Sequence, residues 1–328
     1  MGHLENGSWR EGRDARTVNG EFVRRDAQFR ARVTADGSSG FPAEAGRYHL
    51  YVSTSCPWAH RALIFRKLKG LEEAISISVV DPVVANEGWE FSDGAGCIPD
   101  TINGFQRLHQ VYTKSTADYT GRVSVPVLWD KKTGMIVNNE SSEIIRMLNG
   151  EFEAFAGSHE DYYPAALRPE IDAVNELVYP NINNGVYRTG FATTQDAYER
   201  AFDALFSALD ELEARLARSR YVAGERITEA DWRLFPTLVR FDAVYHGHFK
   251  CNLRRIADYP NLSNYVRDLY QVPGVAETVD MDHIKRHYYA SHRHINPTGI
   301  VPKGPGLDFT APHDRARKFA AVRAAQKR

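Results

Sequence analysis

The sequence predicts an α/β domain followed by an all-α domain, and two observations lead to this fold class. Residues 46–155 combine strand-like alternation with helical patterns, which is typical of an α/β domain. Over residues 165–295 strand patterns almost vanish, and apolar residues recur every three or four positions. With 328 residues, the chain is long enough for two such domains. Segments 1–45 and 296–328 are expected to be an N-terminal extension and an extended C-terminal tail.

The α/β domain opens with a strand, a helix and a second strand. Tyr48, Leu50 and Val52 fall on one side of an alternating pattern, which predicts a strand. A helix is expected to begin at Pro57, because proline suits the first helical position. The run AISISVV at 74–80 predicts the second strand.

A long irregular segment separates this half of the domain from the next. Residues 83–120 contain four glycines, and a loop of this length in a compact domain is usually functional. Strands are then predicted at 124–130 and 135–139, joined by a Lys-Lys-Thr-Gly turn. A helix opened by an asparagine cap at Asn138 or Asn139 completes the domain.

Together these elements form a βαβ unit followed by a ββα unit, which is the thioredoxin arrangement. The parallel strand pair needs its crossover helix. Pro126 stands at the start of the third strand, where this fold holds a cis proline that faces a cysteine. The candidate for that cysteine is Cys56, which lies between the first strand and the first helix.

Three helical patterns support the all-α domain. Residues 198–216 carry apolar side chains at intervals of three and four, which predicts an amphipathic helix. Thr228-Glu-Ala-Asp231 matches a capping box, with aspartate in place of the usual glutamate. A further helix is expected to start with Pro260 and to end at a Pro-Gly pair.

Composition and charge exclude several classes of function. The chain has 41 Lys and Arg against 42 Asp and Glu, so its net charge of −1 gives no reason to expect nucleic acid or a membrane surface as a partner. The sequence contains no apolar run long enough to span a membrane. Its start is polar and contains acids, which argues against a secretory signal or a transit peptide. We therefore expect a cytoplasmic protein.

The cysteines and histidines give little indication of a metal. Cys56, Cys97 and Cys251 are odd in number and widely spaced, so neither a disulfide framework nor a zinc site is expected. His283 and His287 would share one helix face, which either binds a metal or forms part of a basic helical surface. Acids and thiols are scarce nearby, so the surface is the preferred interpretation and no metal is expected.

Cys56 is the candidate nucleophile. A helix N-terminus stabilises a thiolate and lowers the pKa of the thiol, which makes that thiol a better leaving group. Redox proteins of thioredoxin type often carry a second cysteine three residues further on, but this position holds Ala59. A mixed disulfide on Cys56 therefore needs an outside thiol for its release, unless the fold brings Cys97 or Cys251 near. The alternative is that Cys56 is a small buried apolar residue.

Several long motifs resemble one family. The domain order and the segments VPVL, NNESSEII and ITEADWRLFPTLVRFD resemble the cytosolic glutathione transferases. The segments STSCPWAHR, DPVVANEGWEF, NNGVYRTGFATTQ, FKCNLRRIADYPNLSNYVRDLYQ and KRHYYASHRHINPTGIVPKGP are similar to the glutathionyl-hydroquinone reductases, or Xi class. This resemblance extends over about residues 5–315. It implies glutathione as co-substrate, glutathionyl-hydroquinones as substrates, and a homodimer.

The resemblance also implies roles for individual residues. It makes Cys56 the nucleophile and places Tyr187 and Tyr288 at the quinone pocket as catalytic residues. The residues that it places around glutathione are Trp89, Arg122, Val125, Glu140 and Ser141. Their chemistry suits that ligand, because extended backbone can pair with a peptide and a helix start favours a carboxylate.

The two tyrosines suit a reaction in which the leaving atom is a ring carbon. An aryl carbanion is not a feasible leaving group at neutral pH, whereas the keto tautomer of the hydroquinone releases an enolate. Phenolic O–H donors aimed at the ring oxygens stabilise that charge. Two alternatives stay open. One is a thioltransferase or dehydroascorbate reductase of omega type, which shares the cysteine but not the tyrosine pair. The other is a glutathione transferase fold that binds ligands without catalysis.

Overall fold

The computed structural model describes residues 2–12, 17–84 and 86–326, and its contacts divide the chain into two compact units. The first, called the sheet unit below, comprises Met1–Arg16, Arg24–Glu160 and Glu277–Pro302. The second, called the helical unit, comprises Thr17–Val23, Asp161–Ala276 and Lys303–Arg328. Each unit therefore combines segments that are distant in sequence.

A four-stranded sheet forms the centre of the sheet unit, with the strand order β6-β5-β7-β8. Its strands are β5 (Tyr48–Val52), β6 (Ser76–Val79), β7 (Val127–Asp130) and β8 (Met135–Asn138). β5 and β6 run parallel, whereas β7 is antiparallel to both of its neighbours. Every residue of β5 and β7 is buried, as expected for strands covered on both faces. The topology confirms the predicted βαβ and ββα units.

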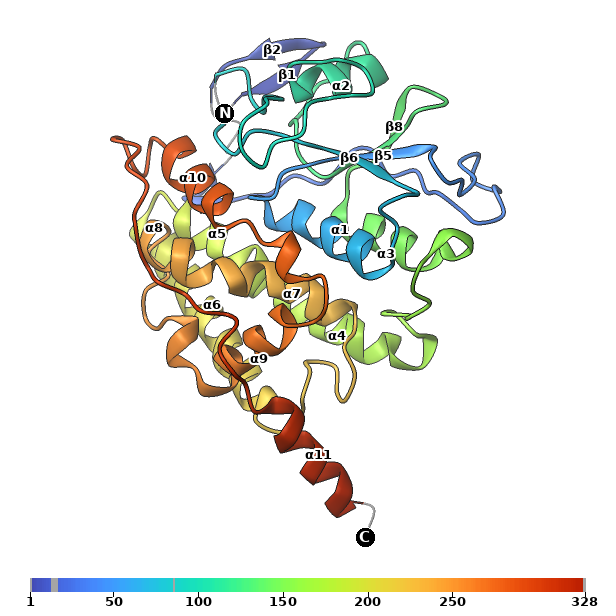
Figure 1. The fold of residues 1–328 in the computed structure, drawn as a ribbon. Coiled ribbons are helices and arrows are strands. Elements are labelled where there is room, and N and C mark those ends of the chain that lie inside the picture. Colours follow the sequence, from blue (N-terminus) through green and yellow to red (C-terminus); the bar gives the residue numbers. More distant parts are fainter. Residues whose placement is uncertain (1, 13–16, 85, 327–328) are drawn as a thin grey trace. The chain divides into compact units, whose positions relative to one another are not determined.

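Three helices flank this sheet. α1 (Pro57–Leu68) and α3 (Ser141–Gly150) lie on one face, and α2 (Leu108–Ser115) lies on the other (Figure 1). The sequence predicts an irregular segment where α2 forms, and this prediction is wrong for its eight residues. A helix of two turns is too short to show a clear period, and packing on the sheet rather than propensity stabilises it.

The start of α3 differs from the predicted asparagine cap. Its N-cap residue is Glu140, whose carboxylate accepts the N–H of Ser142 at 2.9 Å. Asn138 accepts the N–H of Glu140 at 2.7 Å, and Asn139 pairs with the backbone of Phe29. The two asparagines thus act just before the helix, where Asn139 ties the N-terminal extension to this part of the chain.

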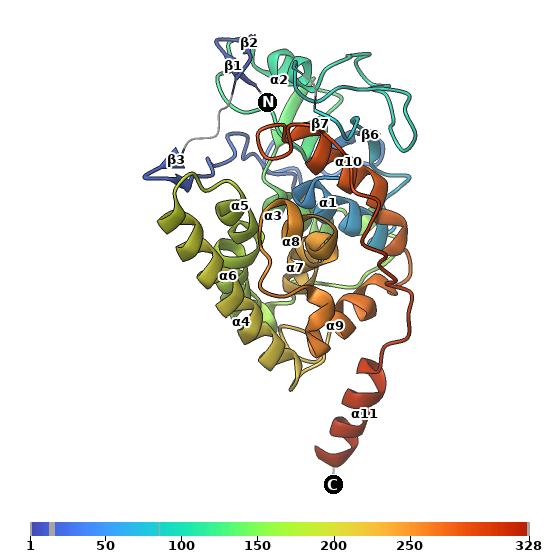
Figure 2. The ribbon, with the colours of Figure 1, turned by 90° about the vertical axis from the view of Figure 1, so that its left-hand side faces the viewer.

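The N-terminal extension contributes two small hairpins. β1 (His3–Glu5) pairs with β2 (Ser8–Arg10), and β3 (Thr17–Val18) pairs with β4 (Glu21–Phe22). The first hairpin belongs to the sheet unit. The second belongs to the helical unit, where β4 contacts α5 (Gly185–Gly190). Figure 2 labels this hairpin at β3.

Helices joined by short connections build the helical unit. α6 (Gln195–Leu216) confirms the amphipathic helix predicted over 198–216, and its buried side is alanine, leucine and phenylalanine. The other main helices are α4 (Arg168–Val178), α7 (Glu229–Arg240), α8 (His246–His248) and α9 (Pro260–Tyr270). Short 3-10 or π segments in the two units are Glu153–Phe155, Ala165–Leu167, Tyr179–Asn183, Phe241–Tyr245, Ile256–Asp258 and Ala276–Thr278. As predicted, α9 begins with Pro260 and a capping box opens α7.

α10 (Met281–Ser291) belongs to the sheet unit, although the sequence division places it in the all-α domain of 165–295. Its side chains bond to the turn before α1 and to the loop after β6, across sequence separations of 205 to 229 positions. Contacts over such distances leave no local signal, which is why helical character alone misplaces this segment.

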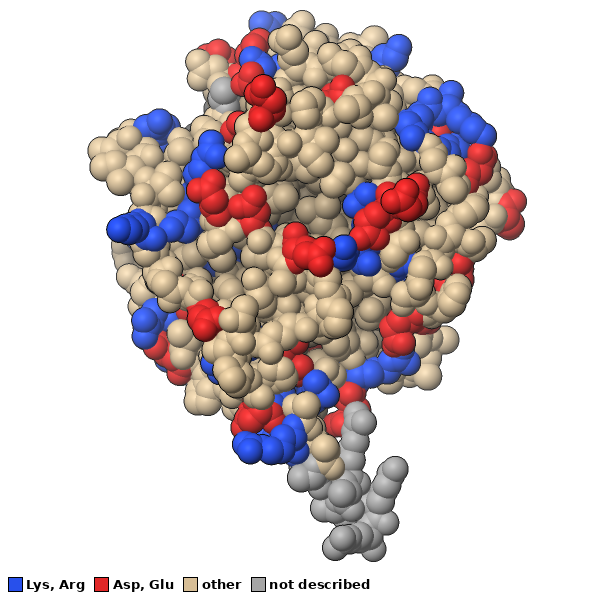
Figure 3. Space-filling view, viewed as in Figure 1, with Lys and Arg blue, Asp and Glu red and all other residues tan. Residues whose placement is uncertain are grey.

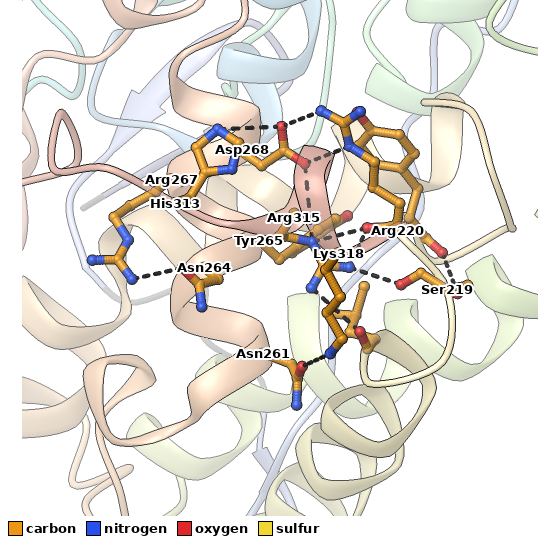
Figure 4. Close-up of polar contacts among 12 residues, drawn as sticks. Ser219, Arg220, Asn261, Asn264, Tyr265, Arg267, Asp268, His313, Arg315 and Lys318 are labelled. Carbon is orange, nitrogen blue, oxygen red and sulfur yellow. Dashed lines mark hydrogen bonds and ion pairs between the residues drawn. The ribbon is translucent and has the colours of Figure 1, made fainter. Parts of the chain in front are cut away.

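The last element described is α11 (Arg315–Gln326), where the sequence predicts an extended tail. Arg315 anchors this helix to the helical unit, because its guanidinium donates to the carbonyl oxygens of Leu216 and Ser219 at 3.3 and 2.8 Å (Figure 4). The last carbonyls of a helix lack partners within it, and Leu216 ends α6. The carboxylate of Asp268 lies 3.9 Å from the same guanidinium.

Charged side chains of both signs are mixed on the face shown in Figure 3, where Lys and Arg lie among Asp and Glu. This mixture agrees with the net charge of −1. Within the described residues, no helix combines the length and the apolar character that a membrane crossing requires.

Candidate active site

Cys56 lies at the junction of β5 and α1. It is the N-cap residue of α1, Pro57 is the first helical residue, and the Cys56 carbonyl accepts the N–H of His60 at 2.9 Å. The Cys56 side chain is half-buried. The first turn of α1 contains no acidic residue, so no nearby carboxylate of that turn offsets the partial positive charge of the helix N-terminus. This position stabilises a thiolate relative to a thiol.

The sulfur of Cys56 faces the chain that leads into β7. It lies 3.7 Å from the carbonyl oxygen of Val125, and the Val125–Pro126 peptide bond is cis, as the sequence predicts. Tyr112 holds the residue before them, because its hydroxyl donates to the Ser124 carbonyl at 2.8 Å and accepts the Ser124 N–H at 3.2 Å. Burial raises the pKa of Tyr112, so this hydroxyl keeps the proton that it donates.

Arg61 joins α1 to the start of α3. Its Nη1 donates to Ser141 Oγ at 3.3 Å, and its guanidinium lies over the ring of Trp58, 4.6 Å from the centroid. Arg61 and Ser141 are only 1% and 3% exposed. Glu140, the N-cap residue of α3, directly precedes Ser141 in the sequence and is half-buried. A positive charge behind the first N–H groups of a helix makes that helix start more favourable for an anion.

Trp89 and Arg122, two further candidates for the glutathione site, each contact an aromatic side chain of the sheet unit. Trp89 lies in the loop between β6 and α2 and is mostly buried. Its indole stacks on the imidazole of His287, with 4.9 Å between centroids and 16° between the planes. Arg122 is half-buried, and its carbonyl oxygen accepts the hydroxyl of Tyr119 at 3.0 Å.

The two tyrosines predicted at the quinone pocket belong to different units. Tyr288 lies on α10 in the sheet unit, is 1% exposed and packs its ring against His287 and His292. Tyr187 lies on α5 in the helical unit, surrounded by three aromatic rings. Both lie within residues 165–295, the all-α domain that the sequence predicts. For Tyr288 the contacts of α10 correct this placement.

Cys97 and Cys251 differ from Cys56 in their surroundings. Cys251 is fully buried in the helical unit, and burial raises the pKa of its thiol far above the ordinary value. Cys97 is half-buried in the loop after β6, where burial also raises the pKa of the thiol. Both thiols therefore resist the ionisation that attack on a disulfide requires.

The histidines of α10 do not form the predicted basic surface. His283 and His287 are only 1% and 8% exposed, and both bond to other parts of the sheet unit. Across the ranges that the structure describes, there is no group of three or more His, Cys, Asp and Glu side chains that could hold a metal ion.

Two family models match the chain, one in each half. The glutathione S-transferase N-terminal domain matches residues 55–151, and the glutathione S-transferase C-terminal domain matches residues 195–268. The glutathionyl-hydroquinone reductase PcpF of Sphingobium chlorophenolicum is 56% identical over 306 residues, which cover 93% of this chain and 96% of that protein. The chain belongs to the glutathionyl-hydroquinone reductases.

Other proteins of this group match this chain over nearly its whole length. The glutathionyl-hydroquinone reductase YqjG of Escherichia coli K12 is 51% identical over 97% of this chain and 100% of that protein. The glutathione-bound structure of YqjG superposes with a TM-score of 0.90 at 50% identity and covers 97% of this chain and 100% of that one. The Xi-class structure from Natrialba magadii gives a TM-score of 0.93 at 50% identity over 97% of this chain and 98% of that one. These similarities confirm the predicted glutathione transferase fold.

The structure of this reductase adds two residues that the sequence analysis does not single out. The sequence does give a sign that Arg61 is functional, because it is a charged residue within the apolar helical segment PWAHRALIF. Tyr112 left none, because α2 is not predicted. Among the predicted residues, the structure joins Cys56 directly to Val125.

Proposed function

We propose that the chain reduces glutathionyl-hydroquinones to hydroquinones with glutathione, through a mixed disulfide between Cys56 and glutathione. One observation carries this proposal. The half-buried thiol of Cys56 lies at the N-terminus of α1, 3.7 Å from the Val125 carbonyl, and Ala59 occupies the position of a second thiol. Membership of the reductase family supports the proposal, as does the binding of glutathione by YqjG.

The proposed glutathione site combines backbone and side-chain groups. Val125 offers its N–H and C=O to the cysteinyl unit, as in strand addition. The N–H and hydroxyl of Ser141, at the start of α3, take the γ-glutamyl carboxylate, and Glu140 takes the ammonium group. Arg122 pairs with the glycyl carboxylate, and the indole of Trp89 lies over the tripeptide.

The reaction consists of two attacks on sulfur. In the first, the Cys56 thiolate attacks the glutathionyl sulfur, and a disulfide forms as the bond from that sulfur to the ring carbon breaks. The electron pair of the broken bond goes to the ring, which takes up a proton and leaves as hydroquinone. In the second, the thiolate of a free glutathione attacks the glutathionyl sulfur of the disulfide. Glutathione disulfide leaves, and the Cys56 thiolate is regenerated.

The ring accepts that electron pair as an enolate, after the hydroquinone has changed to its keto tautomer. Tyr187 and Tyr288 are proposed to donate their phenolic protons in hydrogen bonds to the ring oxygens, which stabilises the developing charge. Both tyrosines lie among other rings, and such surroundings suit a planar aromatic substrate.

A reaction without free glutathione tests the proposal. The enzyme should stop after one hydroquinone per active site, and mass spectrometry should find one glutathione on Cys56. Cys56→Ser should lose reduction by several orders of magnitude, because a hydroxyl is not ionised at neutral pH and forms no disulfide. Cys97→Ser is the matched control and should keep its activity. Full activity in Cys56→Ser, or an internal bond from Cys56 to Cys97 or Cys251, would contradict the mechanism.

We also propose that the enzyme is a homodimer that works in the cytoplasm. The resemblance to the Xi class supports the homodimer, and cysteines in the thiol form at positions 56, 97 and 251 suit a compartment that keeps thiols reduced. Light scattering after gel filtration measures the assembly. A homodimer should have twice the chain mass of 37.0 kDa. A measured mass equal to that of one chain would contradict the proposal.

A further inference from the structure

His283 of α10 makes a bridge between two segments of the sheet unit. Its Nε2 lies 2.7 Å from the carbonyl oxygen of Ala95, and its Nδ1 lies 2.7 Å from Oγ1 of Thr54. A carbonyl oxygen only accepts, so Nε2 carries a proton, and in the neutral ring Nδ1 accepts the hydroxyl of Thr54. Thr54 stands two residues before Cys56. The imidazole therefore ties the turn that presents the nucleophile to the loop after β6.

His287 lies one helical turn further on, on the same face of α10. Its Nδ1 donates to the carbonyl oxygen of Pro82 at 2.8 Å. Its ring lies almost parallel to the indole of Trp89, at 4.9 Å and 16°. One side chain thus holds the start of the loop and sets the plane of the indole.

Other contacts keep α10 itself in place. Asp280 caps the helix by accepting the N–H of His283 at 2.9 Å, and Ser291 Oγ accepts the N–H of Val84 at 2.9 Å. The loop between β6 and α2 is therefore attached near its start, near Trp89 and at Ala95. A helix attached to other segments near both ends, through His283 and Ser291, is a rigid support for the groups that it contacts.

We propose that His283 and His287 are positioning residues for glutathione transfer: His283 places the Cys56 turn, and His287 places Trp89. This inference rests on the proposed function, because it assigns Trp89 to the glutathione site. His283 acts through the Cys56 turn, and His287 acts through Trp89. α10 connects these two parts of the site to each other and carries Tyr288. Reacting groups that are displaced by about 1 Å can lose about a hundredfold in rate, so such support has a direct effect on catalysis.

The two histidines should therefore affect different kinetic constants. His287→Ala removes the bond to Pro82 and the stacking partner of Trp89, and should weaken glutathione binding about tenfold, measured by calorimetry and as KM. kcat should stay within about twofold of wild type. His287→Phe keeps a stacking ring but no donor, and should lie between Ala and wild type.

His283→Ala should instead lower kcat about tenfold with little change in glutathione affinity, since it releases the Cys56 turn. Because Cys56 serves every substrate, reduction of a glutathionyl-hydroquinone and of a small glutathione mixed disulfide should fall together. His283→Asn keeps an acceptor near the position of Nδ1 and should recover part of the rate. The effects of Thr54→Val and His283→Ala on kcat should not add, because both remove the same bond.

His248→Phe is the matched control. His248 is 5% exposed in the helical unit and stacks on Phe249 at 5.3 Å, so it resembles His287 in burial and ring contact. Its variant should change the thermal midpoint but leave glutathione affinity and turnover of the small mixed disulfide unchanged. The inference is overturned if the variants of His283 and His287 likewise lower the midpoint and leave kcat, KM and glutathione affinity unchanged. An inactive wild-type enzyme that binds glutathione would instead refute the proposed function, and the calorimetric comparison would still decide the role of His287.

Discussion

In the proposed mechanism, the Cys56 thiolate is needed for every glutathione transfer, whereas a phenol donor is needed only when the leaving atom is a ring carbon. A small glutathione mixed disulfide releases a thiolate, which is stable without further help. A glutathionyl-hydroquinone releases an enolate, whose charge gains from hydrogen-bond donors. The two kinds of residue can therefore be separated by the choice of substrate, even though Tyr288 and Cys56 belong to the same unit.

Tyr288→Phe should reduce turnover of a glutathionyl-hydroquinone by about 10²–10³, the usual effect of losing one oxyanion donor. The same variant should act almost normally on the small mixed disulfide, and Tyr187→Phe should behave alike. The measurement is the ratio of the two activities in each variant. A parallel fall with both substrates would mean that the tyrosines support the fold, and the enolate mechanism would lose its main support.

Among the helices, α7 shows most directly how a short motif is used in the tertiary structure. Asp231 accepts the N–H of Thr228 at 2.8 Å and the Thr228 side chain accepts the backbone N–H of Asp231, which together form the predicted capping box. Asp231 also accepts the hydroxyl of Thr228 at 3.1 Å. The same carboxylate also accepts the N–H of Val222 at 3.0 Å and the hydroxyl of Tyr265 at 2.7 Å. A cap of one helix thus joins α7 to α9 and to the turn after α6.

Asp231→Ala should lower the free energy of unfolding by about 3 kcal/mol or more, because it leaves buried donors without an acceptor. Urea denaturation measures this change. Asp196→Ala is the control, since Asp196 is an exposed acid in the first turn of α6 and its removal should cost about 0.5 kcal/mol at most. Equal effects of the two substitutions would show that the buried network adds nothing to an ordinary cap.

For the molecule as a whole, acid stability depends in part on His49 at the centre of the sheet. His49 is fully buried on β5, and its ring nitrogens lie 2.8 and 3.0 Å from the hydroxyls of Ser76 and Ser78 on β6. Burial lowers its pKa from 6.5 to about 4. Between pH 6.5 and pH 4, His49 is therefore protonated in the unfolded chain but neutral in the folded chain. The free energy of unfolding falls as the pH drops through this range.

His49→Gln should remove this contribution. The free energy of unfolding of the wild type, compared with the variant, should decrease by about 2–3 kcal/mol between pH 7 and pH 4.5. Between pH 7 and pH 8 the difference between the two proteins should stay constant, which serves as the internal control. A difference that is independent of pH down to 4.5 would show that His49 is protonated in the folded protein.

Local patterns were sufficient for the elements whose signals lie within a few residues. The period of α6, the capping box of α7, the strands of the sheet and the place of Cys56 at the start of α1 all follow from spacing and caps. The resemblance of long motifs was sufficient for the family. These features can be predicted from residues that are close in the sequence, because helix and strand periods indicate which face of an element is buried.

Only the tertiary structure decided the supports of the site. α2 forms because it packs on the sheet, α10 joins the sheet unit, and Arg61 donates to Ser141 across 80 positions. The bond between Thr54 and His283 spans 229 positions. By sequence alone His283 is a histidine on a polar helix, and whether it binds a metal, faces solvent or bridges two loops depends on which distant groups the fold brings to its two nitrogens.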